Sequence, residues 1–90
     1  MDRNKNNTGK KETWEVQGKI KYIRNMIDKK GNNYLILHLV GIASIFVFPK
    51  KVPPEKWGNL KEKLDYIFIV EEGNNGTNIL TDFKLDQTNE

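Results

Sequence analysis

Two short segments of the chain place flat or apolar side chains at every second residue, a spacing that suits the stacking of nucleobases. The first segment carries Tyr34, Ile36 and His38, and the second carries Phe46 and Phe48. A base that stacks on an aromatic ring contributes about 1–3 kcal/mol to the binding of a single strand. A protein partner or a second apolar layer within the domain would use the same rings, so these two interpretations stay open beside base stacking.

Basic side chains flank the rings on both sides in the sequence. Candidates for a groove that follows the phosphates are Lys19, Lys21, Arg24, Lys29, Lys30, Lys50 and Lys51. A basic groove together with stacking rings is the usual surface for single-stranded nucleic acid. Each lysine taken alone is more simply explained by solvation, so the prediction depends on their grouping.

The residue types give little support to other kinds of site. The chain has no cysteine and a single histidine, which excludes disulfides, thiolate nucleophiles and cysteine-ligated metals. The carboxylates of Glu71–Glu72, Asp82 and Asp86 lack the regular spacing of a cation site. No serine or threonine has a suitable base and orienting acid, and no glycine loop is built to cradle phosphates. We therefore expect no enzyme, no metal and no cofactor.

The net charge of +3 is divided unevenly along the 90 residues. Residues 1–51 hold 11 basic and 4 acidic side chains, net +7, whereas residues 52–90 hold 4 and 8, net −4. A local basic patch is the electrostatic footprint of a nucleic-acid binder. A polyanionic partner is therefore expected to meet the first half of the chain.

The length fits one small domain with polar ends. Residues 1–12 are polar and basic, so we expect a disordered basic arm there, with a frayed end at residues 87–90. The sequence has neither an apolar run long enough to cross a membrane nor a signal-peptide core, so we expect a cytoplasmic protein that does not enter the membrane. Residues 13–86 remain for a single folded domain.

The first part of that domain has the patterning of strands. Residues 14–20 alternate apolar and polar side chains, and the phase then slips at Ile23, which predicts a long strand with a bulge near Tyr22. Asp28–Asn33 has the composition of a turn. A second and a third strand are expected at Tyr34–Val40 and Ile45–Phe48.

These two strands predict a hairpin whose faces differ. If its turn is centred on Ile42, the expected cross-strand pairs are Leu37–Val47, Leu39–Ile45, Ile36–Phe48 and His38–Phe46. The face opposite the rings is then purely aliphatic and carries Leu35, Leu37, Leu39, Ile45 and Val47.

The second half predicts a short helix and two further strands. Pro53 or Pro54 suits the first turn of the helix, and Gly58 weakens it. Its apolar face is expected to carry Trp57, Leu60 and Leu64. Strands are expected at Tyr66–Val70 and Thr77–Leu85, with a turn-rich loop over Glu71–Gly76 between them. In the last strand one parity carries Ile79, Phe83 and Leu85, and the tryptophans Trp14 and Trp57 are expected in the core.

The order of five strands with a helix after the third resembles the nucleic-acid-binding OB domains. The resemblance is carried by Val16–Ile20 with Ile23, by Gly31–Tyr34 and by Leu60–Ile69, and it covers about residues 13–86. It implies an all-β fold, a five-stranded Greek-key barrel with a short helix between strands 3 and 4. In that family strands 2 and 3 and the loops joining strands 1–2 and 4–5 bind the ligand. The resemblance thereby adds four loop residues to the site, Asn32, Asn33, Asn74 and Asn75.

Together these features predict a non-enzymatic protein that binds single-stranded DNA with little sequence preference in replication or repair. RNA is a second nucleic acid that fits the same pattern. The alternative is an accessory subunit that docks on a larger replication enzyme, such as a polymerase, primase or helicase, through its apolar face or its acidic half. The sequence leaves the oligomeric state open.

Overall fold

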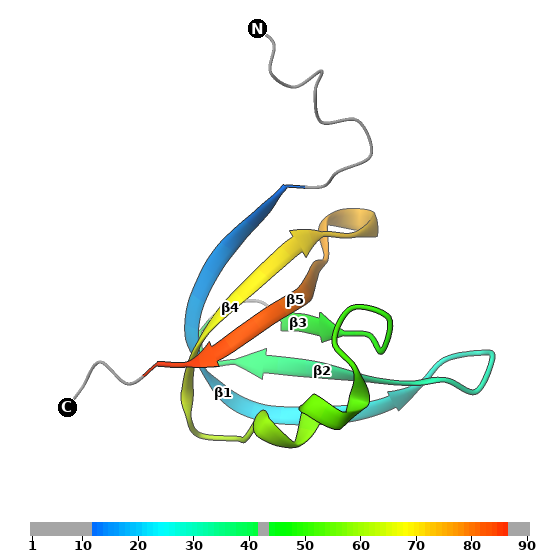
Figure 1. Ribbon diagram of the computed structural model, residues 1–90, viewed down its shortest axis with the longest axis horizontal. Coiled ribbons are helices and arrows are strands. Elements are labelled where there is room, and N and C mark those ends of the chain that lie inside the picture. The colour runs from blue at the N-terminus through cyan, green and yellow to red at the C-terminus, as the bar shows by residue number, and fades with distance from the viewer. Residues whose placement is uncertain (1–11, 42–43, 87–90) are drawn as a thin grey trace, which may run out of the picture.

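The computed structural model describes residues 12–41 and 44–86, and within them five strands form one closed barrel (Figure 1). The strands are β1 (Thr13–Ile27), β2 (Asn33–Leu39), β3 (Ser44–Val47), β4 (Asp65–Glu72) and β5 (Asn78–Leu85). Two short 3-10 helices, η2 (Pro54–Asn59) and η3 (Asn74–Gly76), precede β4 and β5. The predicted arm before Glu12 and the predicted frayed end lie outside the described residues.

The barrel has the strand order β1-β2-β3-β5-β4, which confirms the predicted five-stranded topology. Neighbouring strands are antiparallel except β3 and β5, which run parallel with Phe46 opposite Ile79. The sheet closes because β1 has two partners. Its first part, Thr13–Lys19, pairs with β4, and its second part, Ile20–Ile27, pairs with β2.

A bulge allows β1 to change partner. The register with β2 shifts between Ile20 and Tyr22, which leaves Lys21 without a cross-strand partner and confirms the predicted bulge. Ile20 is fully buried and Ile23 packs against the same core although the two residues are an odd number apart. The phase slip in the sequence is therefore the bend by which one strand lines two sides of the barrel.

The aliphatic face predicted for the β2–β3 hairpin fills the barrel interior. Its members, Leu35, Leu37, Leu39, Ile45 and Val47, are at most 5% exposed. From β4 the core receives Phe68 and Tyr66. The Tyr66 hydroxyl donates to the Asn59 carbonyl at 2.7 Å and accepts from the Lys61 N–H at 2.8 Å, so this buried ring has no unmet polar atom.

The register of the hairpin differs from the predicted one. The observed pairs are Leu35–Val47, Ile36–Phe46, Leu37–Ile45 and His38–Ser44. The prediction of a turn at Ile42 is wrong because the pairs are centred on Gly41, whose φ of +75° lies in the left-handed region that favours glycine. The resulting shift of two residues keeps every side chain on its face. The assignment of the two faces is therefore confirmed.

The segment between β3 and β4 is a short 3-10 helix, and the predicted helical face through Leu64 is wrong. η2 ends at Asn59, Leu60 is extended and buried, and Leu64 is 40% exposed. A continuous helix is excluded because Lys63 has a φ of +73°. Trp57 packs against the core as predicted, and its Nε1 donates to the Val52 carbonyl at 2.8 Å.

The last two strands also depart from the expected pattern. β4 continues to Glu72, through residues expected in a loop. A register shift opposite Ile69 and Val70 leaves Thr81 unpaired in β5, so the parity of that strand changes there. As a result Leu80 is fully buried although it does not share the predicted apolar parity, and Phe83 packs against the core as that parity predicts. Leu85 has the same parity as Phe83 but is the last residue of β5 and is 43% exposed.

Candidate nucleic-acid interface

Three aromatic rings form a group on the outer face of β2 and β3, and we call Tyr34, Phe46 and Phe48 the ring triad. Their centroids are 5.3 Å apart for Tyr34–Phe48, 6.1 Å for Phe46–Phe48 and 6.3 Å for Tyr34–Phe46. The planes are inclined by 18–34°, so the rings are closer to parallel than to edge-on. All three are half-buried. They lie outside the core, which occupies the other face of the same strands.

A second ring pair extends this face towards β1. Tyr22 and His38 are cross-strand partners whose rings stack at 4.4 Å with planes 18° apart. On the β3 side the Ser44 hydroxyl lies 3.1 Å from His38 Nδ1. No carboxylate among the hydrogen-bond partners of His38 in the described residues orients the imidazole as a catalytic triad requires. The Ser44 contact instead holds the imidazole in its stacked position against Tyr22.

Cross-strand pairing brings a cation into the same surface. Arg24 of β1 is opposite Ile36, and Ile36 is opposite Phe46. Met26 is opposite Tyr34 in the next row. Sequence reasoning placed Arg24 at the site but missed Tyr22 and Met26. The sequence does contain the signal for both residues. After the bulge, Tyr22 and Met26 are each two positions from Arg24, so their side chains lie on the same face of β1.

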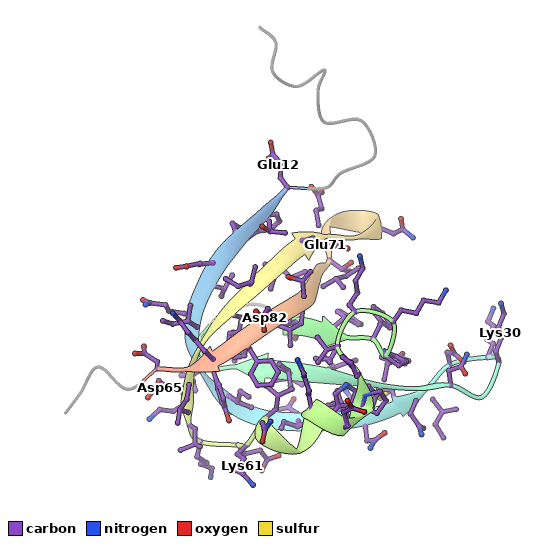
Figure 2. All side chains as sticks on the ribbon, in the orientation of Figure 1. Glu12, Lys30, Lys61, Asp65, Glu71 and Asp82 are labelled. Carbon is purple, nitrogen blue, oxygen red and sulfur yellow. The ribbon has the colours of Figure 1, made fainter. Side chains whose placement is uncertain are left out.

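The β1–β2 turn projects from the barrel with Lys30 at its tip (Figure 2), and from here on the arm means this β1–β2 turn and not residues 1–12. Asp28 Oδ1 accepts from the N–H groups of Asn32 at 2.9 Å and Lys30 at 2.8 Å. The Asn32 N–H above all, with that of Lys30, holds the pKa of this carboxyl below its ordinary value of 3.8. Gly31 completes the turn with a φ of +88°. The exposed Lys29 and Lys30 therefore sit on a turn of defined shape.

A pocket of about 300 Å³ lies where this arm meets the end of β3. It is lined by Asp28, Asn32, Asn33, Tyr34, Phe48, Pro49 and Lys50. Two rings of the triad thus share a hollow with amide groups and one lysine amine. A nucleotide fits this chemistry, with its base against a ring and its phosphate near Lys50.

Comparisons with known proteins bear on the fold. No family model matches the chain, and no curated protein matches it by sequence. Among solved structures, the chain is similar to the mitochondrial single-stranded DNA-binding protein of S. cerevisiae, with a TM-score of 0.60 over 83% of this chain and 93% of that one. The domain is an OB fold. At 13% sequence identity the likeness concerns the fold, so individual site residues must be argued from this chain.

The OB fold keeps some predicted site residues away from the ring triad. Lys19 pairs with Asp65 of β4 on the other side of β1, and Lys21 occupies the bulge. Lys51 forms an ion pair with the buried Glu71, with 3.1 Å between Nζ and Oε2. Asn74 lies in η3, whose loop is remote from the β1–β2 arm in Figure 1, together with the backbone of residue 75. The side chain of Asn75 lies outside what the structure describes.

Acidic side chains lie over the remainder of the OB barrel. Figure 2 shows Glu12 at the start of β1, Asp65 at the start of β4 and Asp82 on β5, all away from Lys30. Lys61 also lies away from Lys30 in the same view, so both signs of charge are present on this part of the barrel. Within residues 12–41 and 44–86, no helix is long and apolar enough to cross a membrane. The same part of the chain holds no group of three or more acidic or histidine side chains suited to a metal ion.

Proposed function

We propose that the protein binds single-stranded DNA without catalysing a reaction, on the outer face of β2 and β3. The observation that carries this proposal is the ring triad, three half-buried rings inclined by 18–34° to one another, two of which, Tyr34 and Phe48, share a pocket with Lys50. The structurally similar yeast protein is itself described as binding single-stranded DNA, which supports the proposal. Every base has a flat face, so stacking on these rings implies little sequence preference.

In this arrangement the bases and the phosphates of the strand meet different parts of the surface. Bases stack on the ring triad and on the Tyr22–His38 pair, and the phosphates follow the cations on β1, on the arm and after β3. These cations are Arg24, Lys29, Lys30 and Lys50. The face is open on the outside of the barrel, so a strand can lie along it without its ends being threaded.

Salt dependence of binding tests the phosphate contacts. Each phosphate neutralised on a single strand contributes about 0.7 to the slope of log affinity against log salt, so four cations predict about a 50-fold loss of affinity from about 50 to about 200 mM salt. The measurement is fluorescence anisotropy of labelled oligo-dT, with duplex DNA and oligo-U of equal length as comparisons. A flat salt response, or equal affinity for duplex, would contradict the proposal. Equal affinity for oligo-U would extend it to RNA.

Two adjacent lysines supply a matched pair for the same titration. Lys50 lines the pocket beside the rings, whereas Lys51 is held by Glu71. Lys50→Gln is expected to lower the salt slope by about 0.7. Lys51→Gln is expected to lower the free energy of unfolding by about 1–3 kcal/mol because Glu71 loses its charge partner, with little change in the slope. The reverse pattern would place the phosphate path on the Lys51 side.

For the biological role we propose the protection of single strands exposed in DNA replication or repair in the cytoplasm. A binder with little sequence preference suits that task because the exposed sequence changes as the strands open. Docking on a polymerase, primase or helicase is the second candidate role. It is favoured by a second pocket, which is lined by Trp14 and two carboxylates.

A further inference from the structure

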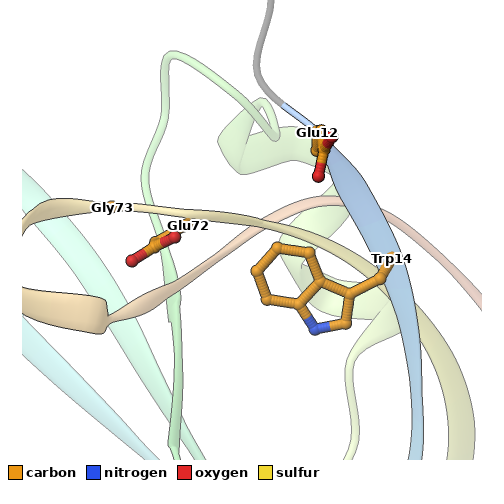
Figure 3. A pocket seen from close by; sticks show the side chains of 4 residues that line it. All are labelled: Glu12, Trp14, Glu72 and Gly73. Carbon is orange, nitrogen blue, oxygen red and sulfur yellow. The ribbon is translucent and has the colours of Figure 1, made fainter. Parts of the chain in front are cut away.

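A pocket of about 350 Å³ lies at the start of β1, on the side of the barrel away from Lys30. It is lined by Glu12, Trp14, Glu72 and Gly73. Figure 3 shows the indole of Trp14 facing the hollow, with the carboxylates of Glu12 and Glu72 on different sides of it. The pocket thus combines one large aromatic face with two acidic groups.

Trp14 is exposed where the sequence predicts a core residue. It has the inward parity of Val16 and is opposite the buried Val70, yet 42% of it is exposed. The prediction of burial is wrong because the indole lies beside Glu72 and Gly73 at the rim of the barrel, although its strand partner Val70 is in the core. An exposed indole of this size leaves much of its possible burial free energy unused in folding. That free energy remains available for a binding partner.

The opposite wall of the pocket is backbone held in a fixed shape. The Gly73 N–H donates to the Thr77 carbonyl at 2.7 Å. A Cβ at residue 73 would overlap Ile79 Cδ1 and would lie 2.7 Å from Thr77 Oγ1. The β4–β5 turn is therefore packed directly against this glycine, and the hollow exists before any ligand arrives.

We propose that this pocket binds a lysine or arginine side chain of a protein partner. A cation is attracted to the face of an indole, most strongly when it is partly desolvated, and carboxylates beside the ring add charge-assisted hydrogen bonds. The aliphatic stem of the same side chain covers the apolar part of the ring. Complementarity of charge selects this occupant, because Glu12 and Glu72 would repel a phosphate backbone and attract a basic segment.

The proposal separates two surfaces of one small domain. Nucleic acid meets the ring triad and the arm, whereas a basic protein segment meets the rim at Trp14. It therefore goes beyond the proposed DNA binding and does not depend on it. The class of partner is a protein with an exposed lysine or arginine, as on a DNA-handling enzyme whose surface is basic.

The two indole N–H signals of the full-length ¹⁵N-labelled protein provide the test. The chain has two tryptophans, and Trp57 donates its Nε1 to Val52 away from the pocket, so its signal is an internal control. The probe is a short glycine-flanked peptide with one lysine and one arginine, compared with a peptide in which norleucine and citrulline replace them. We expect a saturable shift of the Trp14 signal alone and at least about tenfold weaker binding of the uncharged peptide.

Substitutions identify which groups bind. Glu12→Gln with Glu72→Gln is expected to weaken the lysine–arginine peptide at least about tenfold. Glu15→Gln with Asp65→Asn removes the same charge elsewhere and is expected to have little effect. Trp14→Leu is expected to abolish peptide binding and to leave the affinity for oligo-dT unchanged, which separates this surface from the DNA surface.

Three outcomes would overturn the proposal. The first is no saturable Trp14 shift at millimolar peptide, and the second is equal binding of the uncharged peptide. The third is a Trp14 signal that does not shift with the peptide but shifts for another reason. A shift in the Lys10→Gln, Lys11→Gln double variant would show that the occupant is the chain itself, and a shift on addition of oligo-dT would show that it is the nucleic acid. Failure of oligo-dT binding alone would overturn the DNA proposal and leave this one standing.

Discussion

The aromatic side chains of this domain divide between two tasks according to the face of the sheet that carries them. Tyr66 and Phe68 are inside the barrel, where the Tyr66 hydroxyl has two hydrogen-bond partners. The ring triad is outside, half-exposed, and adds little to the core. An outer apolar group of this kind is costly to leave in water unless something binds it, which makes its residues the sharpest test of function.

Truncation of the triad is predicted to reduce DNA affinity without unfolding the barrel. Phe46→Ala and Phe48→Ala each remove one stacking surface, so we expect a loss of about 1–3 kcal/mol, or about 5- to 150-fold in affinity for oligo-dT. Phe48→Leu keeps apolar volume but removes the flat ring, and it is expected to lose most of the same affinity. Anisotropy titrations measure the binding, and thermal unfolding by circular dichroism checks the fold.

An exposed apolar residue outside the ring triad provides the control. Leu85 on β5 is 43% exposed, so Leu85→Ala removes a comparable exposed group and is expected to leave the affinity unchanged. If Phe48→Leu bound oligo-dT as well as the wild type, the triad would act as an apolar contact and not as a stacking surface.

At the scale of elements, alternation predicted faces better than it predicted positions along the chain. The β2–β3 faces are right although the register is displaced by two residues, because parity survives an even shift. The bulge at Lys21 was visible because the apolar phase slips between Ile20 and Ile23. The bulge at Thr81 has the same signal in the odd spacing of Leu80 and Phe83, but Ile79 shares the parity of Phe83 and conceals it.

Two further errors come from effects that periodicity does not contain. The helical spacing of Trp57, Leu60 and Leu64 ignores the positive φ of Lys63, which depends on the tight path into β4. The inward parity of Trp14 does not show that its indole lies at the rim of the barrel, beside Glu72 and Gly73. In the binding surface, the rings and the lysines of the β1–β2 arm were predicted from the residues, whereas the four loop asparagines followed from family resemblance alone. Asn32 and Asn33 line the pocket beside the rings, and Asn74 and Asn75 lie on a different loop.

The β1–β2 arm is predicted to lose its defined shape in acid. Hydrogen bonds to Asn32 and Lys30 lower the pKa of Asp28 in the folded turn below its ordinary value of 3.8. The stabilisation of the turn by this carboxylate is therefore fully present above about pH 3.8 and is lost as the pH falls through the lowered pKa. Amide hydrogen exchange at residues 30 and 32 measures this loss, corrected for the intrinsic pH dependence of exchange.

A neutral side chain at residue 28 separates this titration from general acid unfolding. Asp28→Asn keeps an acceptor oxygen for the two N–H groups but cannot titrate, so protection of residues 30 and 32 should become independent of pH in the same range. Amides of the core strand β4 serve as the reference for the whole barrel. Equal acid sensitivity of the Asn variant and the wild type would show that Asp28 does not control the arm.

For the whole molecule, a net charge of +3 does not describe the two candidate binding surfaces. Arg24, Lys29, Lys30 and Lys50 lie about the arm and the ring triad, whereas Glu12 and Glu72 line the pocket beside Trp14. At about 0.15 M salt the Debye length is about 8 Å, which is short beside the 42 Å long dimension of the molecule. The two surfaces should therefore act almost independently under those conditions.

This independence predicts that oligo-dT and a lysine–arginine peptide bind the protein at the same time. The peptide affinity, read from the Trp14 indole signal, should change by less than about threefold when the DNA site is saturated at about 0.15 M salt, since most long-range interaction is screened. At low salt the bound strand adds negative charge, so the peptide should bind more tightly, and linkage requires the peptide to tighten DNA binding by the same factor. Displacement of the peptide by oligo-dT at either salt concentration would show that the two surfaces overlap.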